Sequence, residues 1–268
     1  ANSVVVDEPY CLDIPGSGRW CPENYTRDYK GPVTLTQALA QSINVPAVKV
    51  AQRAGLDNVR RVASDFGIES DMADGPALAL GASESTLLEM TGAYAGILNG
   101  GSSVTPFGMS NLRLMGEDTA LMTRETGIGE RVIREAAARE LVWMMSRVVE
   151  EGTGRRARLP GREVAGKTGT TQAARDAWFL GFTADYVAGV WMGYDDNTPL
   201  TGVTGGGLPA EIWRETMSRV HDGLPPKPLP MQRPAPRATA TDLPPPRQRA
   251  PVAGNNPIET ILRSIFGN

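Results

Sequence analysis

Two short groups of polar residues in this chain could carry chemistry. Lys167, Thr168, Gly169, Thr170 and Thr171 follow one another and combine a cation, three hydroxyls and a glycine; Ser42 and Asn44 stand well before them. A lysine ammonium and short hydroxyl donors are groups that hold a carboxylate. Glycine has no Cβ, so a ligand or a second backbone can approach it closely. The first group therefore predicts an anion-binding strand.

The Lys-Thr-Gly triplet alone is weak evidence. At average residue usage it arises by chance in roughly one chain in ten or twenty of this size. Ser42 and Asn44 alone are more often a helix C-cap pair than catalytic groups. The function of both groups must therefore be inferred from the rest of the sequence.

The histidine count limits the chemistry. The chain has a single histidine, His221, which argues against a Ser-His-Asp hydrolase, a Cys-His protease and a His-ligated zinc centre. Any acyl transfer would have to use lysine as its base. We expect no metal and no cofactor. The net charge of -3 argues against nucleic acid as the main partner.

The two cysteines, Cys11 and Cys21, flank a loop rich in glycine and proline. No C-x-x-C pair or further ligand indicates a metal or redox site, so we favour a local disulfide, which would imply an oxidising compartment. The alternative is two unpaired thiols in a loop.

The element that carries Lys167 is expected to be a strand at 163–171, after the breakers at 159–161. Further strands are expected at 177–183 and 187–194, and the short connection between those two predicts antiparallel pairing. A helix at 209–221 would cover the sheet. Three tryptophans are expected in the core between them: Trp178, Trp191 and Trp213.

Ser42 and Asn44 are expected at the joint between two helices. Thr34 and Gln37 form a capping box that begins a helix at 35–41. The residue before a proline avoids helical geometry, so Pro46 is expected to begin the next helix, which ends at Gly55. Side chains at such a joint can point into a cleft.

The remaining elements are expected from the same signals. Residues 7–33 are rich in turn formers and are expected to be a long surface loop, and residues 104–122 a hairpin. Helices are expected at 57–66, from Thr86 to Asn99, and from Arg134 or Glu135 to Glu151. Ser83 lies in a segment similar to a G-x-S-x-G elbow, but Ser85 replaces the second glycine and a histidine base is lacking, so a catalytic role is not favoured.

Longer stretches around both groups carry a resemblance to a known family. They are GPVTLTQALAQSINVPAVKV, LALGASESTLLEMTGAYAGILNGG, VVEEGTGRRARLPGREVAGKTGTT, DAWFLGFTADYVAGVWMGYDD and GGGLPAEIWRETM. In this order they resemble the transpeptidase domain of class A, bifunctional penicillin-binding proteins, over about residues 20 to 220. Ser42-Ile43-Asn44 and Lys167-Thr168-Gly169 match the second and third motifs of penicillin-recognising serine transpeptidases.

The resemblance implies a fold and a reaction. The fold would be α/β of the α+β type: an antiparallel sheet flanked by helices plus an all-helical subdomain, as in penicillin-binding proteins and β-lactamases. The parent protein would cross-link D-Ala-D-Ala stem peptides of peptidoglycan through a serine acyl-enzyme. Ser42, Asn44 and Lys167 would be catalytic, and Thr168, Gly169, Thr170 and Thr171 would bind substrate. Thr170 N-H would form half of an oxyanion hole.

One departure from the family pattern is important. No serine of this chain has a lysine three positions later, so the S-x-x-K motif with the nucleophile and its base is absent. We expect the nucleophile in residues that precede Ala1, a fold incomplete at its N-terminal side, and no activity from this fragment alone.

The expected organisation has three parts. Residues 1–223 would be the partial transpeptidase domain, 224–257 a Pro-rich, disordered linker, and 258–268 a short amphipathic helix. No apolar run is long enough to span a membrane. The resemblance implies a parent with an N-terminal membrane anchor and a glycosyltransferase domain, on the periplasmic side of the bacterial inner membrane.

The resemblance also implies partners and leaves two alternatives open. Expected partners are peptidoglycan stem peptides, lipid-linked glycan strands and β-lactam antibiotics, with regulators at the C-terminal tail. The membrane would be reached only through the missing anchor. The alternatives are a serine β-lactamase or β-lactam sensor, and a non-catalytic scaffold that binds cell-wall regulators.

Overall fold

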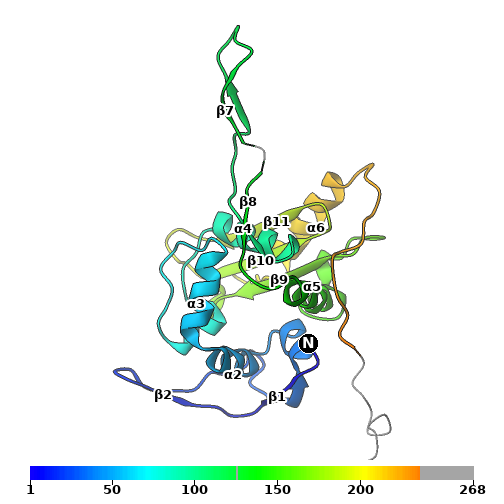
Figure 1. Cartoon of the computed structure of the whole chain (residues 1–268). Helices are drawn as coiled ribbons and strands as arrows, with labels where there is room; N and C mark the ends of the chain where they lie inside the picture. The colour runs from blue at the N-terminus through cyan, green and yellow to red at the C-terminus, as the bar shows by residue number, and fades with distance from the viewer. Residues whose placement is uncertain (125, 236–268) are drawn as a thin grey trace, which may run out of the picture. The chain divides into compact units, whose positions relative to one another are not determined.

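The computed structural model of the protein describes residues 1–124 and 126–235 (Figure 1). Residues 1–234 form one compact unit. The expected helix at 258–268 and most of the expected linker lie outside the described residues. Among those that are described, no helix is long and apolar enough to cross a membrane.

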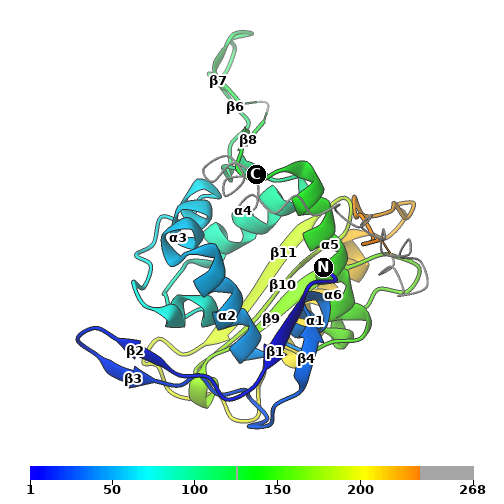
Figure 2. The same cartoon turned by 60° about the horizontal axis from the view of Figure 1, so that its bottom comes forward.

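The centre of this unit is a three-stranded antiparallel sheet. Its strands are β9 (Ala165–Thr170), β10 (Asp176–Phe182) and β11 (Val187–Gly193), with β10 in the middle. Lys167 lies opposite Leu180 on β10. Figure 2 shows the three strands side by side. The predicted strands and the antiparallel pairing of the last two are thus confirmed, because short connections leave neighbouring strands little alternative.

Helices pack against both faces of the sheet. On one face Phe179 packs against Trp213 of α6 (Leu208–Val220), with ring centroids 5.3 Å apart. On the other, Phe182 packs with Met145 of α5 (Glu135–Glu150), beside α4 (Leu87–Leu98). Burying each such side chain contributes about 1.5–3 kcal/mol to stability. The sheet that carries Lys167 is therefore held rigidly from both sides.

Gly166, immediately before Lys167, is required by this packing. A Cβ at this position would lie 2.7 Å from the carbonyl oxygen of Leu180 and 2.8 Å from the ring of Phe179. Both neighbours are fixed in the central strand, so β9 can approach β10 here only with a glycine.

Ser42 lies in the turn between α1 (Leu35–Ala40) and α2 (Asn44–Ala54), and Asn44 is the first residue of α2. The next elements are α3 (Leu56–Asp65) and a 3-10 turn at Pro76–Leu80. The capping box of Thr34 and Gln37 is formed as predicted. The second helix begins at Asn44 rather than at Pro46. Proline is tolerated anywhere in a first turn because those N-H groups have no partner within the helix.

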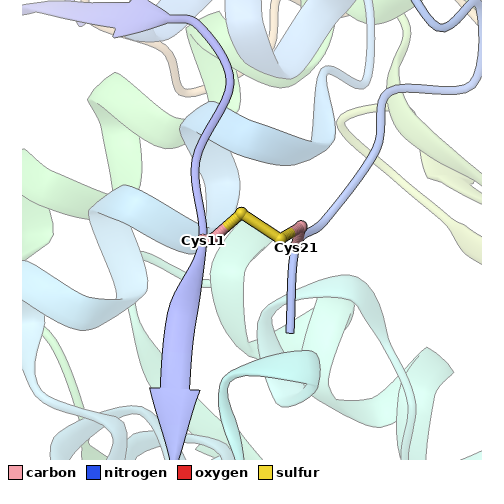
Figure 3. Close-up of a disulfide and its surroundings, with 2 residues drawn as sticks. All are labelled: Cys11 and Cys21. Carbon is pink, nitrogen blue, oxygen red and sulfur yellow. A yellow bond between two sulfur atoms is a disulfide. The ribbon is translucent and has the colours of Figure 1, made fainter. Parts of the chain in front are cut away.

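The N-terminal segment is more ordered than the predicted surface loop. β1 (Val4–Asp7) pairs with β4 (Gly31–Thr34), and β2 (Leu12–Ile14) pairs with β3 (Gly18–Trp20). A disulfide joins Cys11 to Cys21 across the β2 and β3 hairpin (Figure 3). The expectation of a surface loop over 7–33 was wrong, since the segment contains three strands and its residues Asp7 and Asn24 are buried.

A long arm interrupts the chain between α4 and α5. β5 (Ser102–Val104) pairs with β8 (Ile128–Arg131), and beyond them β6 (Asn111–Arg113) pairs with β7 (Ala120–Thr123). Figures 1 and 2 both show the hairpin of β6 and β7 extending away from the sheet. The predicted hairpin exists, but its apolar side chains, such as Leu114 and Met115, are exposed.

Two expectations about the core need correction. Trp191 is 39% exposed, because it stands on the outer strand where its indole N-H donates to Asp176 Oδ1 at 2.9 Å. The expected linker from 224 onward includes Leu229, which is 5% exposed and packs in the cluster with Phe182. Leu229 N-H also donates to Glu163 at 2.7 Å. The packed part therefore continues past 223, since Met231 packs against the same cluster and the Gln232 N-H donates to the Arg139 carbonyl oxygen.

Candidate active site

The fold brings the two sequence-predicted groups into contact. Lys167 Nζ donates to Ser42 Oγ at 2.7 Å, although 125 residues separate them. It also donates to the carbonyl oxygen of Thr168 at 2.8 Å. Two of the three ammonium hydrogens thus form hydrogen bonds within the protein, and the third can donate to a ligand.

The environment of Lys167 changes its acidity. The ammonium is partly covered between β9 and the joint of α1 and α2, and this burial lowers its pKa to about 8 from an ordinary value of 10.5. Burial disfavours the charged form because fewer water molecules solvate it. Lys167 is therefore a cation at neutral pH that gives up its proton more readily than an exposed lysine.

Ser42 is presented by the end of α1. The Ile43 N-H donates to the Ala38 carbonyl at 2.9 Å, which is the bond that closes a Schellman-type helix end. Ser42 stands at the left-handed position of this end, with φ of 56°. Glycine is usual there, and another residue costs about 1 kcal/mol. This sharp turn places the hydroxyl next to Lys167 rather than along the helix.

Asn44 is the first residue of α2, and its side chain is held by the segment before β4. Its Nδ2 donates to the carbonyl oxygen of Glu23 at 2.7 Å. That bond uses one of the two Nδ2 hydrogens and fixes the direction of the amide. Oδ1 can then accept an N-H from a ligand, and the second Nδ2 hydrogen can donate to one.

The threonines of β9 are oriented by other loops. Thr168 Oγ1 shares a hydrogen bond of 2.7 Å with Thr153 Oγ1, from the turn after α5. Thr170 Oγ1 accepts from the Gly205 N-H at 3.0 Å. Because the Thr170 hydroxyl acts as acceptor there, its own hydrogen remains able to donate to an anion.

Gly205 shows how closely that loop approaches the strand. A Cβ on it would clash with the carbonyl oxygens of Trp178 and Gly169. The loop before α6 thus approaches the end of β9 closely, and Gly205 lies against the backbone there while its N-H bonds to the Thr170 hydroxyl.

Thr171 and Gly169 have different surroundings. Thr171 Oγ1 accepts from the Asp176 N-H at 2.8 Å, so this hydroxyl stabilises the turn between β9 and β10. Gly169 lies opposite Trp178 in the register of the sheet. Of the candidate residues, Ser42 and Lys167 are in direct contact. Thr168 follows Lys167 in the chain, and Thr171 stabilises the turn.

His221 is held by structural contacts. It is buried, and its ring nitrogens contact Thr183 Oγ1 at 2.8 Å and the Met217 carbonyl oxygen at 2.7 Å. These contacts tie the end of α6 to the sheet.

Sequence reasoning missed three residues that support the site. Thr153 orients Thr168, and the buried pair of Asp7 and Asn24 holds the start of α2. No local pattern indicates them, since each acts on a residue at least 15 positions away.

Comparison with known proteins identifies the family. The penicillin binding protein transpeptidase domain model matches residues 12–218. This chain belongs to that family. Penicillin-binding protein 1A of Aquifex aeolicus (strain VF5) is 38% identical over 208 residues, which are 77% of this chain and 28% of that protein. Penicillin-binding protein 1B of Escherichia coli (strain K12) is 35% identical over 204 residues, 74% of this chain and 24% of that protein.

The structural comparison agrees with the family assignment. The crystal structure of penicillin-binding protein 1A from Haemophilus influenzae matches with a TM-score of 0.76 and 29% identity, covering 85% of this chain and 40% of that one. The chain thus has the penicillin-binding transpeptidase fold and corresponds to the transpeptidase domain of class A penicillin-binding proteins. It spans about a quarter to a third of the length of the curated relatives that it matches.

Proposed function

We propose that this chain contributes the non-nucleophile side of a peptidoglycan D,D-transpeptidase site. The contact between Lys167 Nζ and Ser42 Oγ carries this proposal, because it joins the S-x-N and K-T-G motifs of the family at hydrogen-bond distance. The nucleophile is a serine of an S-x-x-K motif in residues that precede Ala1, and its lysine is the base.

The reaction is acyl transfer in two steps. The serine attacks the carbonyl carbon of the D-Ala-D-Ala bond, a C-O bond forms, the C-N bond breaks, and D-alanine leaves. An amine of a neighbouring stem peptide then attacks the acyl-enzyme and releases the serine. A β-lactam imitates the first donor, and its ring C-N bond opens in the same way.

The residues of this chain divide this work between them. Ser42 relays a proton between the nucleophile's lysine and the departing amine, while Lys167 favours that transfer through its charge. Asn44 accepts the N-H of the donor's acyl amide. The donor lies along β9 as an added strand, and Lys167, Thr168 and Thr170 bind its terminal carboxylate. Thr170 N-H is half of the oxyanion hole, an interaction worth about 3 kcal/mol in comparable enzymes.

The proposal extends to the whole protein. The parent is a bifunctional cell-wall synthase with an anchor in the inner membrane and a glycosyltransferase domain that uses lipid-linked glycan strands. Its site faces the periplasm, and the disulfide of Cys11 and Cys21 suits that oxidising compartment. Regulators bind the C-terminal tail.

Labelling by a fluorescent penicillin tests the proposal. A protein lengthened to include the upstream residues should be labelled at one site, whereas this fragment alone should not. The Ser42→Ala and Lys167→Ala variants of the long protein should be labelled at least tenfold more slowly, since each removes an electrostatic contributor to the transition state. A folded long protein that is never labelled would refute the transpeptidase function and favour a scaffold; rapid hydrolysis of the penicillin would show a β-lactamase.

A further inference from the structure

Asn24 is a buried amide in a segment to which the sequence assigned no role. It lies between β3 and β4, is 6% exposed, and makes hydrogen bonds with both ends of its side chain. The buried carboxylate of Asp7, which is 1% exposed, is its partner. A buried polar pair is costly unless its bonds are satisfied, so the arrangement of these bonds is informative.

Asp7 fixes the direction of the Asn24 amide. Asn24 Nδ2 donates to Asp7 Oδ1 at 2.9 Å and to Oδ2 at 3.0 Å, and also to the carbonyl oxygen of Asp28 at 2.8 Å. A reversed amide would turn its oxygen toward the carboxylate, and two acceptors repel each other. Asp7 is itself held by the Lys30 N-H, which donates to Oδ2 at 2.8 Å. The oxygen of Asn24 can therefore point only away from Asp7.

That oxygen reaches the first turn of α2. Asn24 Oδ1 accepts from the N-H of Asn44 at 3.1 Å and from the N-H of Val45 at 3.2 Å. The N-cap residue of α2 is Ile43, whose apolar side chain cannot accept these orphan N-H groups. Asn24 thus caps a helix that begins twenty residues after it.

The neighbouring residue holds the Asn44 side chain. The Glu23 carbonyl oxygen accepts from Asn44 Nδ2 at 2.7 Å, while Asn24 holds the backbone N-H of the same residue. Two consecutive residues therefore fix both the position and the amide direction of Asn44. An Asn44 amide held in this way presents Oδ1 to a donor substrate without a further entropic cost of ordering it.

We propose that Asn24, oriented by Asp7, is a positioning residue that sets the amide of Asn44 for the acyl donor. The inference rests on the proposed function, in which Asn44 accepts the donor's amide N-H. Asn24 acts through Asn44 and does not touch the substrate.

The test measures acylation rate constants of the lengthened protein with two β-lactams. Benzylpenicillin carries an acyl amide that Asn44 can recognise, and 6-aminopenicillanic acid lacks it. Asn24→Ala should lower the second-order rate constant for benzylpenicillin about tenfold, with a much smaller effect on 6-aminopenicillanic acid. The final labelling stoichiometry of the folded protein should not change.

A double-mutant cycle separates positioning from simple stabilisation. Asn44→Ala should cause the same selective loss, and Asn24→Ala combined with Asn44→Ala should be no slower than Asn44→Ala alone. Thr183→Ala is the matched control, because it removes a buried hydrogen bond to His221 at the far end of β10. It should lower the melting temperature and leave both rate constants unchanged.

Exchanging the residues at positions 7 and 24 tests the proposal even if Asn24→Ala does not fold. Asp7→Asn and Asn24→Asp should each slow benzylpenicillin acylation, the second because two carboxylates would adjoin. The Asp7→Asn, Asn24→Asp double variant restores a donor-to-acceptor pair between positions 7 and 24. It leaves the Asp28 carbonyl oxygen without the N-H that Asn24 donates, so it should recover part of the rate. The inference is overturned by equal losses with both β-lactams, by additive effects of positions 24 and 44, or by an exchange that recovers nothing. A wild-type long protein that is not acylated at all refutes the proposed function, and the inference with it.

Discussion

Ser42 combines an unfavourable backbone with a hydroxyl in contact with Lys167. Its φ of 56° is one that residues with a Cβ adopt at a cost of about 1 kcal/mol. Local strain that the surrounding structure maintains is typical of functional sites. Here the strain turns the hydroxyl off the axis of α1 and toward β9.

This strain gives a prediction about stability. Ser42→Gly in the lengthened protein should be about 1 kcal/mol more stable than Ser42→Ala, because both lack the hydroxyl and only alanine retains the strain. Thermal unfolding should show a melting temperature higher by roughly 2–4 °C for the glycine variant. Both variants should be labelled equally slowly by penicillin. If alanine were the more stable substitution, Ser42 would not be strained.

Lys167 predicts a pH dependence. The cation binds the substrate carboxylate, and burial lowers its pKa to about 8, so the charge that binds is lost as pH rises through that value. The second-order rate constant for penicillin acylation should therefore fall above pH 8. Lys167→Arg should be slower throughout but should lack this decline, because a guanidinium stays charged over that range. A decline of the same shape in the arginine variant would assign the titration to another group.

At the scale of elements, the arm is separate from the site. The side chains of β6 and β7 are exposed almost throughout, and the two strands pair with each other. Replacing residues 111–123 with an Asn-Gly turn should keep the bond of Arg124 N-H to Ser110 and leave the fold intact.

The shortened protein should retain its melting temperature within about 2 °C and its penicillin labelling rate. Removal of the turn residues 184–186 is a suitable contrast, since it would break the bonds of Thr183 that hold them and should destabilise the sheet. A large loss of labelling on shortening the arm would show that the arm supports the site.

Elements with local signals could be predicted from the sequence. Thr34 with Gln37 and Thr86 with Glu89 form capping boxes within three residues of each helix start, so both helices were predicted where they occur. The strands around Lys167 were predicted because short turns join them. The family resemblance indicated that Ser42 and Lys167 share one site, and the hydrogen bond between them agrees with it.

Features that depend on long-range contacts could not be predicted. Asp7 and Asn24 lie in a segment whose composition indicates a loop, and the helix that Asn24 bonds to begins twenty residues after it. Thr153 could not be recognised, because its hydroxyl acts only through its contact with Thr168. Leu229 was assigned to a linker because the prolines around it outweigh one apolar side chain.

At the scale of the molecule, the described residues hold in place the side of the proposed active site that this chain supplies. The sheet is covered on both faces, α1 and α2 present Ser42 and Asn44, and Asp7 and Asn24 hold the start of α2 in place. We assign the nucleophile to residues outside this chain, since none of its serines stands three positions before a lysine.

Mapping the penicillin adduct shows directly where the nucleophile lies. The lengthened protein is acylated, digested with a protease and analysed by mass spectrometry, with the fragment treated in parallel. We predict one adduct, on a serine of an S-x-x-K sequence that precedes Ala1, and none on the fragment. An adduct on Ser42, Ser83 or any other serine of residues 1–268 would contradict this assignment.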